Sequence, residues 1–412
     1  MTAAHRMTTG DLPAGLGSAV DEWADDLGRT TRSGKGMRSA LFDAVYTTSG
    51  GTDEAVRAAA GQALELLHEA FLVHDDLADG DDQRRGQPNL QGRTTARATA
   101  WGIGTEAAGH LGQVGGLLGG DLLLVAAMAD FARLPVPAPL LHRVLDEVQS
   151  AVVASIAGEY ADVHGCVERE PADRERALAI GAAKTAAYSV CLPLVLGAML
   201  GGAPDEVIPP LREAGRHLGT AYQVIDDVLG VFGDPAVTGK SNEGDLLRRA
   251  PTVLLAHAAT TDDWPRIDAA LGRPAADPAT MNGHTPDPDT ARELLRECGA
   301  REHAVGIAED LITAARAALD SPAVPHDVRA ALGPTWPPPW RGPDDPAEPP
   351  RGVHRRRPPV QRGDPASVLH VVRTGLPPAR ARHPPARRRD LRVGAGRGRG
   401  RRRRDGRPGR RA

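Results

Sequence analysis

The sequence predicts an all-α protein, a bundle of helices without a β-sheet core. Through most of the first 320 residues, apolar side chains recur every three or four positions, the spacing that gives a helix one apolar face. Clusters such as Pro135-Val136-Pro137 and Gly201-Gly202-Ala203-Pro204 divide these stretches into separate segments. No run of alternating apolar and polar residues is long enough to indicate a useful strand. Together these observations are typical of a helical bundle.

The apolar periodicity places each predicted helix between proline or glycine clusters. Ala63 and Leu64 belong to the apolar stripes that we expect to pack in the core. The many glycines from Gly102 to Gly120 predict a loop. In chain order, we expect helices over Ala55–Ala78, Gly119–Leu134, Leu140–Val163, Ala177–Leu200, Leu211–Val231, Thr252–Ala259 and Asp289–Leu319.

The net charge of −3 hides two parts of opposite charge. Residues 335–412 contain 22 Arg, no Lys and 6 acidic residues, a balance of +16. The preceding 334 residues carry 28 basic and 47 acidic side chains, a balance of −19. Because residues 335–412 are also rich in Pro and Gly, they cannot bury enough apolar surface to offset the entropy of ordering. We therefore predict a folded domain over residues 1–334 and a disordered tail over 335–412.

Cysteine usage and hydropathy indicate where the protein works. The three cysteines are odd in number and far apart, so they indicate neither a disulfide framework nor a zinc site. The polar stretch from Met1 to Leu12 does not resemble a signal peptide. The apolar run Leu117–Ala129 is shorter than the roughly 20 residues of a membrane span, and it contains Asp121. We expect a cytoplasmic protein without a membrane span.

Acidic residues gather at the end of the helix predicted over Ala55–Ala78. His68, Asp75 and Asp79 stand seven and four residues apart, so they share one face of that helix. Two carboxylates at this spacing, with Asp76 beside them, repel each other unless a cation joins them. Sparse oxygen ligands on one face suit Mg²⁺, which keeps several waters and shares its coordination shell with phosphates.

Two arginines follow this acidic face. Arg84 and Arg85 supply guanidinium forks, the groups best matched to phosphate oxygens. The local chemistry is therefore that of a metal with a diphosphate. For a DDxxD pattern by itself, a solvated acidic helix end is the alternative interpretation.

A second acidic pair, Asp226-Asp227, lies far downstream within Tyr222–Asp234. With it, the chain resembles the trans-polyprenyl diphosphate synthases, which carry a DDxxD followed by RRG and a second motif of the FQxxDD type. The resemblance covers residues 15–320 in the right order, and it also includes Ser33–Arg38, Lys184-Thr185 and Gly239-Lys240. It implies the isoprenoid synthase fold, in which antiparallel helices surround a deep central cavity.

Lysine usage supports this resemblance. The chain has three lysines against 47 arginines, and Lys35, Lys184 and Lys240 all fall in motifs that bind diphosphate in the family. A compact ammonium is not interchangeable with a planar guanidinium where a phosphate oxygen must be met at close range. Chance would rarely place all three lysines in three such motifs.

The resemblance implies a Mg²⁺-dependent prenyltransferase. An allylic diphosphate ionises, C4 of isopentenyl diphosphate attacks the resulting cation, and a proton leaves as the chain grows by five carbons. Metal ions between the two acidic motifs, together with lysine and arginine, neutralise the leaving diphosphate. The released diphosphate can accept the proton, so no side-chain base is needed.

Positions within the motifs imply the role of each residue. The implied metal ligands are Asp75, Asp79 and Asp226, with Asp76, Asp227 and Lys184 completing the catalytic set. The allylic diphosphate site matches Arg84, Lys184, Thr185, Gln223 and Lys240. The isopentenyl diphosphate site matches Lys35, Arg38, His68 and Arg85. We expect His74 to be structural, and Gly158–Asp162, which resembles the family's GQxxD, to support the cavity wall.

Phe71 and Ala70 stand four and five residues before Asp75 and are the candidates for setting chain length. Side chains one turn before Asp75 should point at the cavity, and the resemblance links an aromatic near this place to short products. A ring here should stop growth at about three or four isoprene units. Because Ala70 leaves room beside the ring, we expect geranylgeranyl diphosphate, with farnesyl diphosphate as the alternative. The family also implies a homodimer.

The chain departs from the family pattern at three places. Ser33-Gly34 stands where paired glycines precede the first lysine, and the segment before Lys35 is short. Gly230 occupies the position of the usual third aspartate in the second motif. A variant of this kind followed by VFGDP is familiar in bacterial members, so we expect activity to survive.

Other functions remain as alternatives. A class I terpene cyclase would share the fold and the first DDxxD, but it would need an Asn/Ser/Glu metal triad and no isopentenyl diphosphate site. A non-catalytic partner subunit would be expected to have eroded aspartates, and the first motif is intact. The Arg-rich tail could bind nucleic acid or another polyanion, although it lacks interleaved aromatics for stacking on bases. Its composition also matches an out-of-frame reading of GC-rich DNA.

Overall fold

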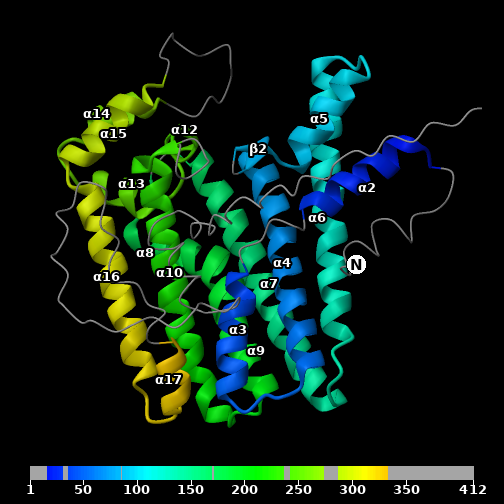
Figure 1. Ribbon diagram of the computed structural model, residues 1–412. Coiled ribbons are helices and arrows are strands. Elements are labelled where there is room, and N and C mark those ends of the chain that lie inside the picture. Colours follow the sequence, from blue (N-terminus) through cyan, green and yellow to red (C-terminus); the bar gives the residue numbers. More distant parts are fainter. Residues whose placement is uncertain are drawn as a thin grey trace, which may run out of the picture. The chain divides into compact units, whose positions relative to one another are not determined.

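The computed structural model describes residues 16–30, 36–84, 86–168, 171–235, 242–272 and 286–332. Over these ranges the protein is helical, as predicted, and its strands there form a single short antiparallel hairpin (Figure 1). The strands are β1 (Gln83–Arg84) and β2 (Gln87–Pro88). The helices are α2 (Ser18–Thr30), α3 (Met37–Thr48), α4 (Glu54–Asp79), α5 (Leu90–Ala100), α6 (Thr105–Ala132), α7 (Ala138–Val167), α8 (Arg174–Gly181), η1 (Ala182–Cys191), α9 (Leu192–Gly201), η2 (Asp205–Val207), α10 (Ile208–Phe232), α12 (Gly244–Arg248), α13 (Val253–Ala258), α14 (Trp264–Leu271), α15 (Pro288–Glu297), α16 (Ala300–Leu319) and α17 (His326–Leu332).

The chain divides into two units, residues 1–377 and 378–412, and every described residue lies in the first. The predicted tail over 335–412 lies outside the described residues. Its disorder and the domain boundary at residue 334 therefore stay predictions.

Helix α4 carries the first acidic motif, and both of its ends follow from the sequence. Asp53 caps the start, where its side chain accepts hydrogen bonds from the backbone amides of Ala55 and Val56. Gly80 ends the helix in the left-handed conformation, with φ 72°. The helix predicted over Ala55–Ala78 is thereby confirmed.

The core lies between the long helices of the bundle. Ala63 and Leu64 of α4 are fully buried in a cluster shared with α3, α6, α7, η1 and α9, as their place in an apolar stripe predicts. A second cluster joins α10 to α13, α14, α15 and α16. Figure 1 shows α4 and α10 both running toward the end of the bundle where the hairpin and α12 lie. The two acidic motifs are therefore brought to the same end.

The segment from Gly102 to Gly120 is mostly helix, so the predicted loop is wrong there. Helix α6 begins at Thr105, and its glycines form a smooth face that touches neighbouring elements. A Cβ at Gly112 would stand 2.0 Å from Thr95 Oγ1, and one at Gly120 would stand 2.3 Å from His74. These glycines permit close helix packing, and that packing offsets their low helix propensity.

The helix predicted over Ala177–Leu200 is continuous, but its middle is wider than an α-helix. Residues Ala182–Cys191 form a π-helix, a geometry found mainly at functional sites. Its backbone lies against two glycines, one on α7 and one on α10. A Cβ added to Gly158 would lie 2.3 Å from the Lys184 amide nitrogen, and a Cβ added to Gly219 would lie 2.4 Å from Ala186 Cα. Helices α7 and α10 thus hold η1 by direct backbone contact.

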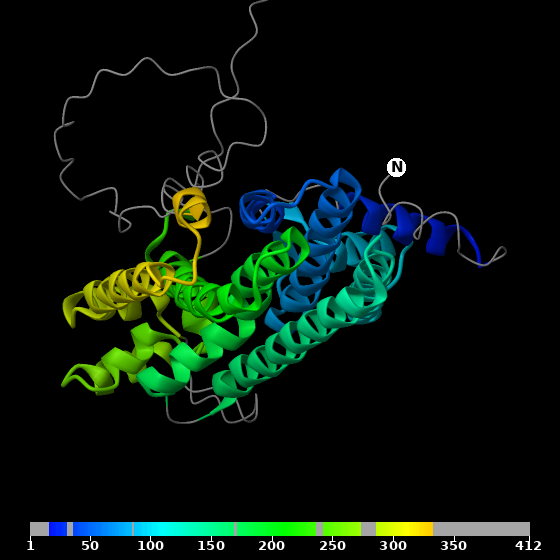
Figure 2. The ribbon, with the colours of Figure 1, turned by 90° about the horizontal axis from the view of Figure 1, so that it is seen from below.

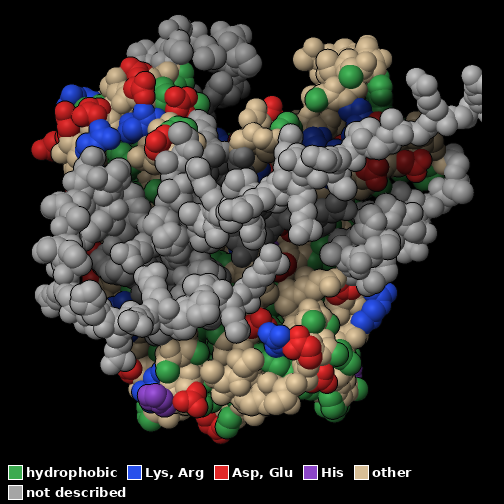
Figure 3. Space-filling model, viewed as in Figure 1, with side chains coloured by type: hydrophobic (Ala, Val, Ile, Leu, Met, Phe, Trp, Pro, Cys, Tyr) green, Lys and Arg blue, Asp and Glu red, His purple; other side chains and the backbone are tan. Residues whose placement is uncertain are grey.

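Other differences from the predicted helices are local. The helix predicted over Asp289–Leu319 is two helices, α15 and α16, because Gly299 adopts φ 76° between them. Arginines on α14 and α15 pair with acids three residues earlier, as Arg266 does with Asp263 and Arg292 with Asp289. Figure 3 shows acidic and basic side chains interspersed over the end of the molecule where α14 and α15 lie.

Two helical stretches, Thr105–Ala132 and Arg174–Gly201, are long and apolar enough to cross a membrane by length and composition. The sequence had indicated none. Both stretches pack within the bundle, the first on α4 and α5 and the second on α7 and α10. Figure 2 shows both stretches packed against other helices of the bundle, the first of them less deeply buried than the second. Two such helices are weak evidence for a membrane span, so we keep the interpretation of a helical bundle.

Candidate active site

The short hairpin after α4 folds an arginine back onto the first acidic motif. Pairing of β1 with β2 places Arg84 so that its Nη2 donates to Asp75 Oδ2 at 2.9 Å. Its Nε donates to Asp76 Oδ1 at 2.8 Å. The predicted grouping of Arg84 with the acidic face is therefore present in the structure.

Lys184 lies at the centre of the site. Its Nζ is 3.1 Å from Asp75 Oδ1 of α4, and on α7 it is 2.7 Å from Asp162 Oδ2 and 3.1 Å from Glu159 Oε2. The lysine side chain is 16% exposed, so it is held between three carboxylates from two other helices. The π-helix and the backbone contact at Gly158 bring it there.

The second acidic motif lies on α10 next to η1. Gln223 connects the two elements, because Thr185 Oγ1 donates to its Oε1 and its Nε2 donates to Asp227 Oδ1 at 2.7 Å. Asp226 is exposed on the same helix. Thr185 and Gln223, predicted for the allylic diphosphate site, are thus joined by hydrogen bonds to Asp227, predicted to support the metal ligands.

The many buried carboxylates of the site shift the pKa values of its acidic and basic side chains. Burial, followed by the neighbouring Asp75 carboxylate, raises the pKa of Asp79 to about 7. Burial also raises the pKa of Asp227 well above its ordinary value, and the Asp245 carboxylate adds to this. Burial by itself would lower the pKa of Lys184, but the carboxylates of Asp75 and Asp162 outweigh it and hold that pKa high.

The donor set suits divalent cations. Acidic side chains from four elements outnumber the described basic ones here: Asp75, Asp76, Asp79, Glu159, Asp162, Asp226, Asp227 and Asp245 against Arg84, Lys184 and Arg248. Among the described ranges, no three acidic, His or Cys side chains converge as a preformed metal cluster. Carboxylates spread over facing helices are expected where a metal is shared with substrate phosphates.

A second group of predicted residues meets around Tyr188 of η1. Its hydroxyl is 3.2 Å from His68 Nδ1, and the Arg38 guanidinium lies over its ring at 5.2 Å. Arg38 is buried and donates from Nη2 to Ser189 Oγ at 2.6 Å. The Phe71 ring packs on Tyr188 with centroids 4.6 Å apart. Arg38 and His68, two of the four predicted isopentenyl diphosphate residues, therefore share one neighbour with the predicted chain-length residue Phe71.

The structure places the remaining predicted residues less directly. Lys35, Arg85 and Lys240 lie outside the described residues, so their roles stay predictions. Ala70 is fully buried in the core. His74 lies away from the motif, with Nε2 3.3 Å from Asp121 Oδ1, in agreement with a structural role.

Glu159 and Asp162 were given only a supporting role by the sequence, yet both bind Lys184. A signal was present, because acidic residues three apart share a helix face. Tyr188, Asp245 and Arg248 were missed altogether. Nothing in their local sequence distinguishes them from packing and surface residues.

Comparison with known proteins now decides the family. The polyprenyl synthetase family profile matches residues 22–283, more than half of the chain. The chain belongs to the polyprenyl synthetase family. The geranylgeranyl diphosphate synthase of Mycobacterium tuberculosis is 32% identical over 288 residues, which is 70% of this chain and 75% of that protein. The (2E,6E)-farnesyl diphosphate synthase of Mycobacterium bovis is 33% identical over 56% of this chain and 59% of its own length.

Solved structures of the polyprenyl synthetase family share this fold. The geranylgeranyl pyrophosphate synthase of Corynebacterium glutamicum, complexed with isoprenyl diphosphate and magnesium, superposes with a TM-score of 0.69 at 29% identity. The match covers 80% of this chain and 92% of that one. The polyprenyl synthetase of Streptomyces coelicolor A3(2) gives 0.61 at 26% identity, over 80% and 93%. The predicted isoprenoid synthase fold and short-chain prenyltransferase family are thereby confirmed.

Proposed function

We propose that this member of the polyprenyl synthetase family condenses an allylic diphosphate with isopentenyl diphosphate, uses Mg²⁺, and releases geranylgeranyl diphosphate. The observation that carries the proposal is the Lys184-Thr185 pair of η1. Lys184 Nζ lies 3.1 Å from Asp75 Oδ1 of the first acidic motif, and Thr185 donates to Gln223, which in turn donates to Asp227 of the second. Helix η1 therefore links both acidic motifs, and its lysine adds positive charge where a diphosphate must be neutralised. The relatives named as geranylgeranyl diphosphate synthases support the chain length.

The test is product analysis of the purified protein. Isopentenyl diphosphate would be supplied with each allylic starter, with Mg²⁺ or with a chelator. We expect a C20 product that requires the metal. A C15 product would support the farnesyl alternative, and a cyclised hydrocarbon formed without isopentenyl diphosphate would contradict the proposal.

Each residue of the site has a separate role in the proposed reaction. Mg²⁺, when bound by Asp75, Asp79 and Asp226, supplies positive charge to the departing diphosphate. Lys184 and Arg84 are fixed by their carboxylates before substrate arrives, so they would place positive charge beside the same oxygens. Asp76 and Asp227 orient Arg84 and Gln223.

Arg38 and His68 support the second substrate site. The buried Nε of Arg38 makes no hydrogen bond among the described residues, so this N–H is left to donate to a bound ligand. Both side chains contact Tyr188, which fixes their positions. An anionic isopentenyl diphosphate would satisfy this donor and bring C4 toward the allylic cation.

Phe71→Ala should lengthen the product. Phe71 is half-buried and its ring packs on Tyr188, so it retains surface that a growing prenyl chain can meet. Ala70 is fully buried, and its contribution is to leave space beside the ring. Removing the ring should open this space and shift the chromatographic product distribution beyond C20. Phe71→Met, which nearly conserves volume, serves as the control and should keep the parent distribution. Equal chain lengths for Phe71→Ala and the parent would make Phe71 a packing residue.

We also propose a homodimer, formed through α6 and α7. Exposed apolar side chains on α7 recur at spacings of three and four residues: Val153, Ile156, Tyr160, Val163 and Val167. On α6, Leu111, Leu118 and Val125 recur every seven residues. Regular stripes of this kind are typical of helices that pack on other helices. The occupant that we propose for these exposed stripes is the same pair of helices of a second copy, related by a two-fold axis.

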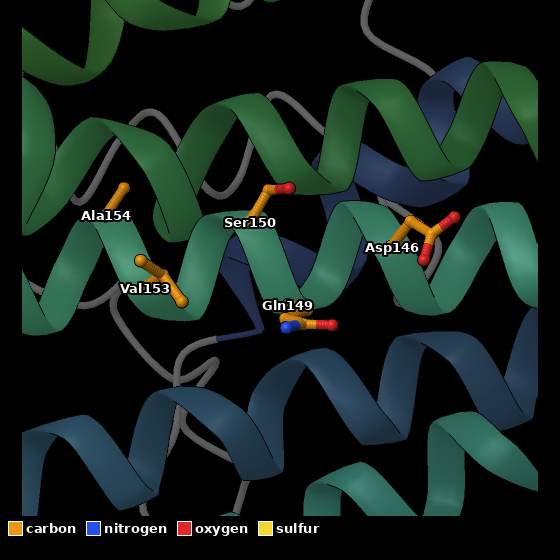
Figure 4. Close-up of a pocket in the computed structure, with 5 residues that line it drawn as sticks. All are labelled: Asp146, Gln149, Ser150, Val153 and Ala154. Atoms are coloured by element: carbon orange, nitrogen blue, oxygen red, sulfur yellow. The ribbon is translucent and has the colours of Figure 1, made fainter.

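A shallow depression continues the α7 stripe toward the start of the helix. It is lined by Asp146, Gln149, Ser150, Val153 and Ala154, all from α7, as Figure 4 shows. Val153 belongs both to the depression and to the apolar stripe. The depression is therefore a place where a side chain of the second copy can seat.

Ile156→Asp should convert the dimer to monomers. The substitution places a charge in the middle of the apolar stripe, and the two-fold symmetry of a homodimer places it there twice. Sedimentation velocity should show about half the parent mass, with an unchanged circular dichroism spectrum at room temperature. Trp101→Asp, at an exposed apolar residue outside the two helices, is the matched control. A parent protein that sediments as a monomer would contradict the dimer.

A further inference from the structure

An arginine outside the predicted site residues lies against the first acidic motif. Arg248, at the end of α12, places Nη1 3.0 Å from Asp79 Oδ1 and 3.3 Å from the Asp79 carbonyl oxygen. Its Nη2 donates to Asp245 Oδ1 at 2.9 Å. Arg248 thus joins the last aspartate of the first motif to a carboxylate that comes shortly after the second motif.

Gly230 makes this arrangement possible. A Cβ at residue 230 would lie 2.3 Å from Asp245 Oδ2, so any side chain there would displace that carboxylate. The family resemblance places an aspartate at this position of the second motif. In this chain the carboxylate comes from α12 instead, and the same short helix brings Arg248 with it.

The guanidinium of Arg248 keeps capacity to bind a ligand. The side chain is 28% exposed, although two carboxylates hold it. A guanidinium has five N–H donors, and the contacts to Asp79 and Asp245 use three of them. A planar cation fixed in this way is suited to a phosphate oxygen, because little further freedom is lost on binding.

We propose that Arg248 is a diphosphate-binding residue of this enzyme and that Asp245 is the residue that positions it. The proposal rests on the proposed function, since the diphosphate is the one held beside Asp75 and Asp79. Arg248 adds a cation from the α12 side to those that Arg84 and Lys184 supply from the hairpin and η1. The glycine in the second motif is then part of the diphosphate site.

The competing role is purely structural. Arg248 contacts a carbonyl at the C-terminal end of α4, and a cation there stabilises a helix end without any ligand. A structural role predicts that removing Arg248 disturbs the acidic motif itself. Metal binding and diphosphate binding would then weaken together.

Calorimetric titration with two probes separates these roles. Inorganic diphosphate in the presence of Mg²⁺ reports the anion site, and Mn²⁺ without diphosphate reports the carboxylates. We expect Arg248→Gln to weaken diphosphate binding by about tenfold or more, and not to weaken Mn²⁺ binding, because a competing cation has left Asp79. Arg248→Lys should restore part of the affinity.

Two further variants complete the experiment. Gly230→Ala favours the helix but pushes the Asp245 carboxylate away, so it should weaken diphosphate binding while every charge is retained. Arg266→Gln breaks a pair of the same spacing, with Asp263 at 2.8 Å, on a surface away from the site, and should change neither titration. Unchanged diphosphate binding in Arg248→Gln, or equal loss of Mn²⁺ and diphosphate binding, would overturn the proposal. A parent that binds no diphosphate with Mg²⁺ would instead contradict the proposed function.

Discussion

Replacing Asp75 by Asn should lower kcat by at least about a hundredfold while the protein stays folded. Asp75 accepts from Arg84 on one oxygen and lies 3.1 Å from Lys184 on the other, so its charge organises both cations. An amide of the same shape loses that charge and is a poor ligand for Mg²⁺. Initial rates of product formation and a thermal melt followed by circular dichroism measure the two parts of the expectation.

Asp82→Asn is the matched control for this variant. Asp82 lies three residues after Asp79 in the loop that follows α4, and it is exposed. The same change of charge there should leave kcat within about twofold, since an exposed charge contributes little. Near-normal turnover in Asp75→Asn with a normal melt would remove Asp75 from the metal ligands.

Exchanging Lys184 should be almost as damaging, and the two available exchanges should fail differently. Lys184→Arg keeps the charge but must fit a longer planar group between Asp162 at 2.7 Å and Glu159 at 3.1 Å. We expect a large loss of kcat/KM for the allylic substrate with a nearly unchanged melt. Lys184→Gln leaves the carboxylates facing one another, so it should also cost roughly 3 kcal/mol of stability.

An Arg→Lys exchange at a surface ion pair is the control for the Lys184→Arg exchange. Arg212→Lys alters the exposed ion pair with Glu147, 2.8 Å long, between α10 and α7. Neither kinetics nor the melt should change there. If Lys184→Arg also left kcat/KM and the melt unchanged, the importance assigned to the rare lysines would be wrong.

Local patterns predicted the helical fold and the acidic face of α4. Asp75 and Asp79 share a face because they are four residues apart on one helix, and neighbours on a single helix can be read from spacing. The apolar stripes that bury Ala63 and Leu64 follow from the same geometry. Family motifs then extended the prediction to Lys184, which no spacing would have placed beside Asp75.

Contacts between elements could not be predicted in this way. Lys184 meets Glu159 and Asp162 because a glycine lets two backbones touch, and nothing in GEYAD alone specifies the partner. The predicted loop before Gly120 failed for the same reason, since glycine favours loops until a neighbouring helix needs the space. Arg248 was missed because its partner Asp79 is far away in the sequence.

The backbone contacts that hold η1 on α7 and α10 affect how this enzyme responds to heat. Backbone rests on backbone at Gly158 and Gly219, with no flexible side chain in between to absorb movement. The backbone of Lys184 therefore keeps its place relative to Glu159 and Asp162 while η1 stays on α7. Local opening usually begins where buried contacts are few, whereas η1 packs on α7, α9 and α10 and its second half is buried. Catalytic geometry and the bundle should consequently be lost in a single cooperative step.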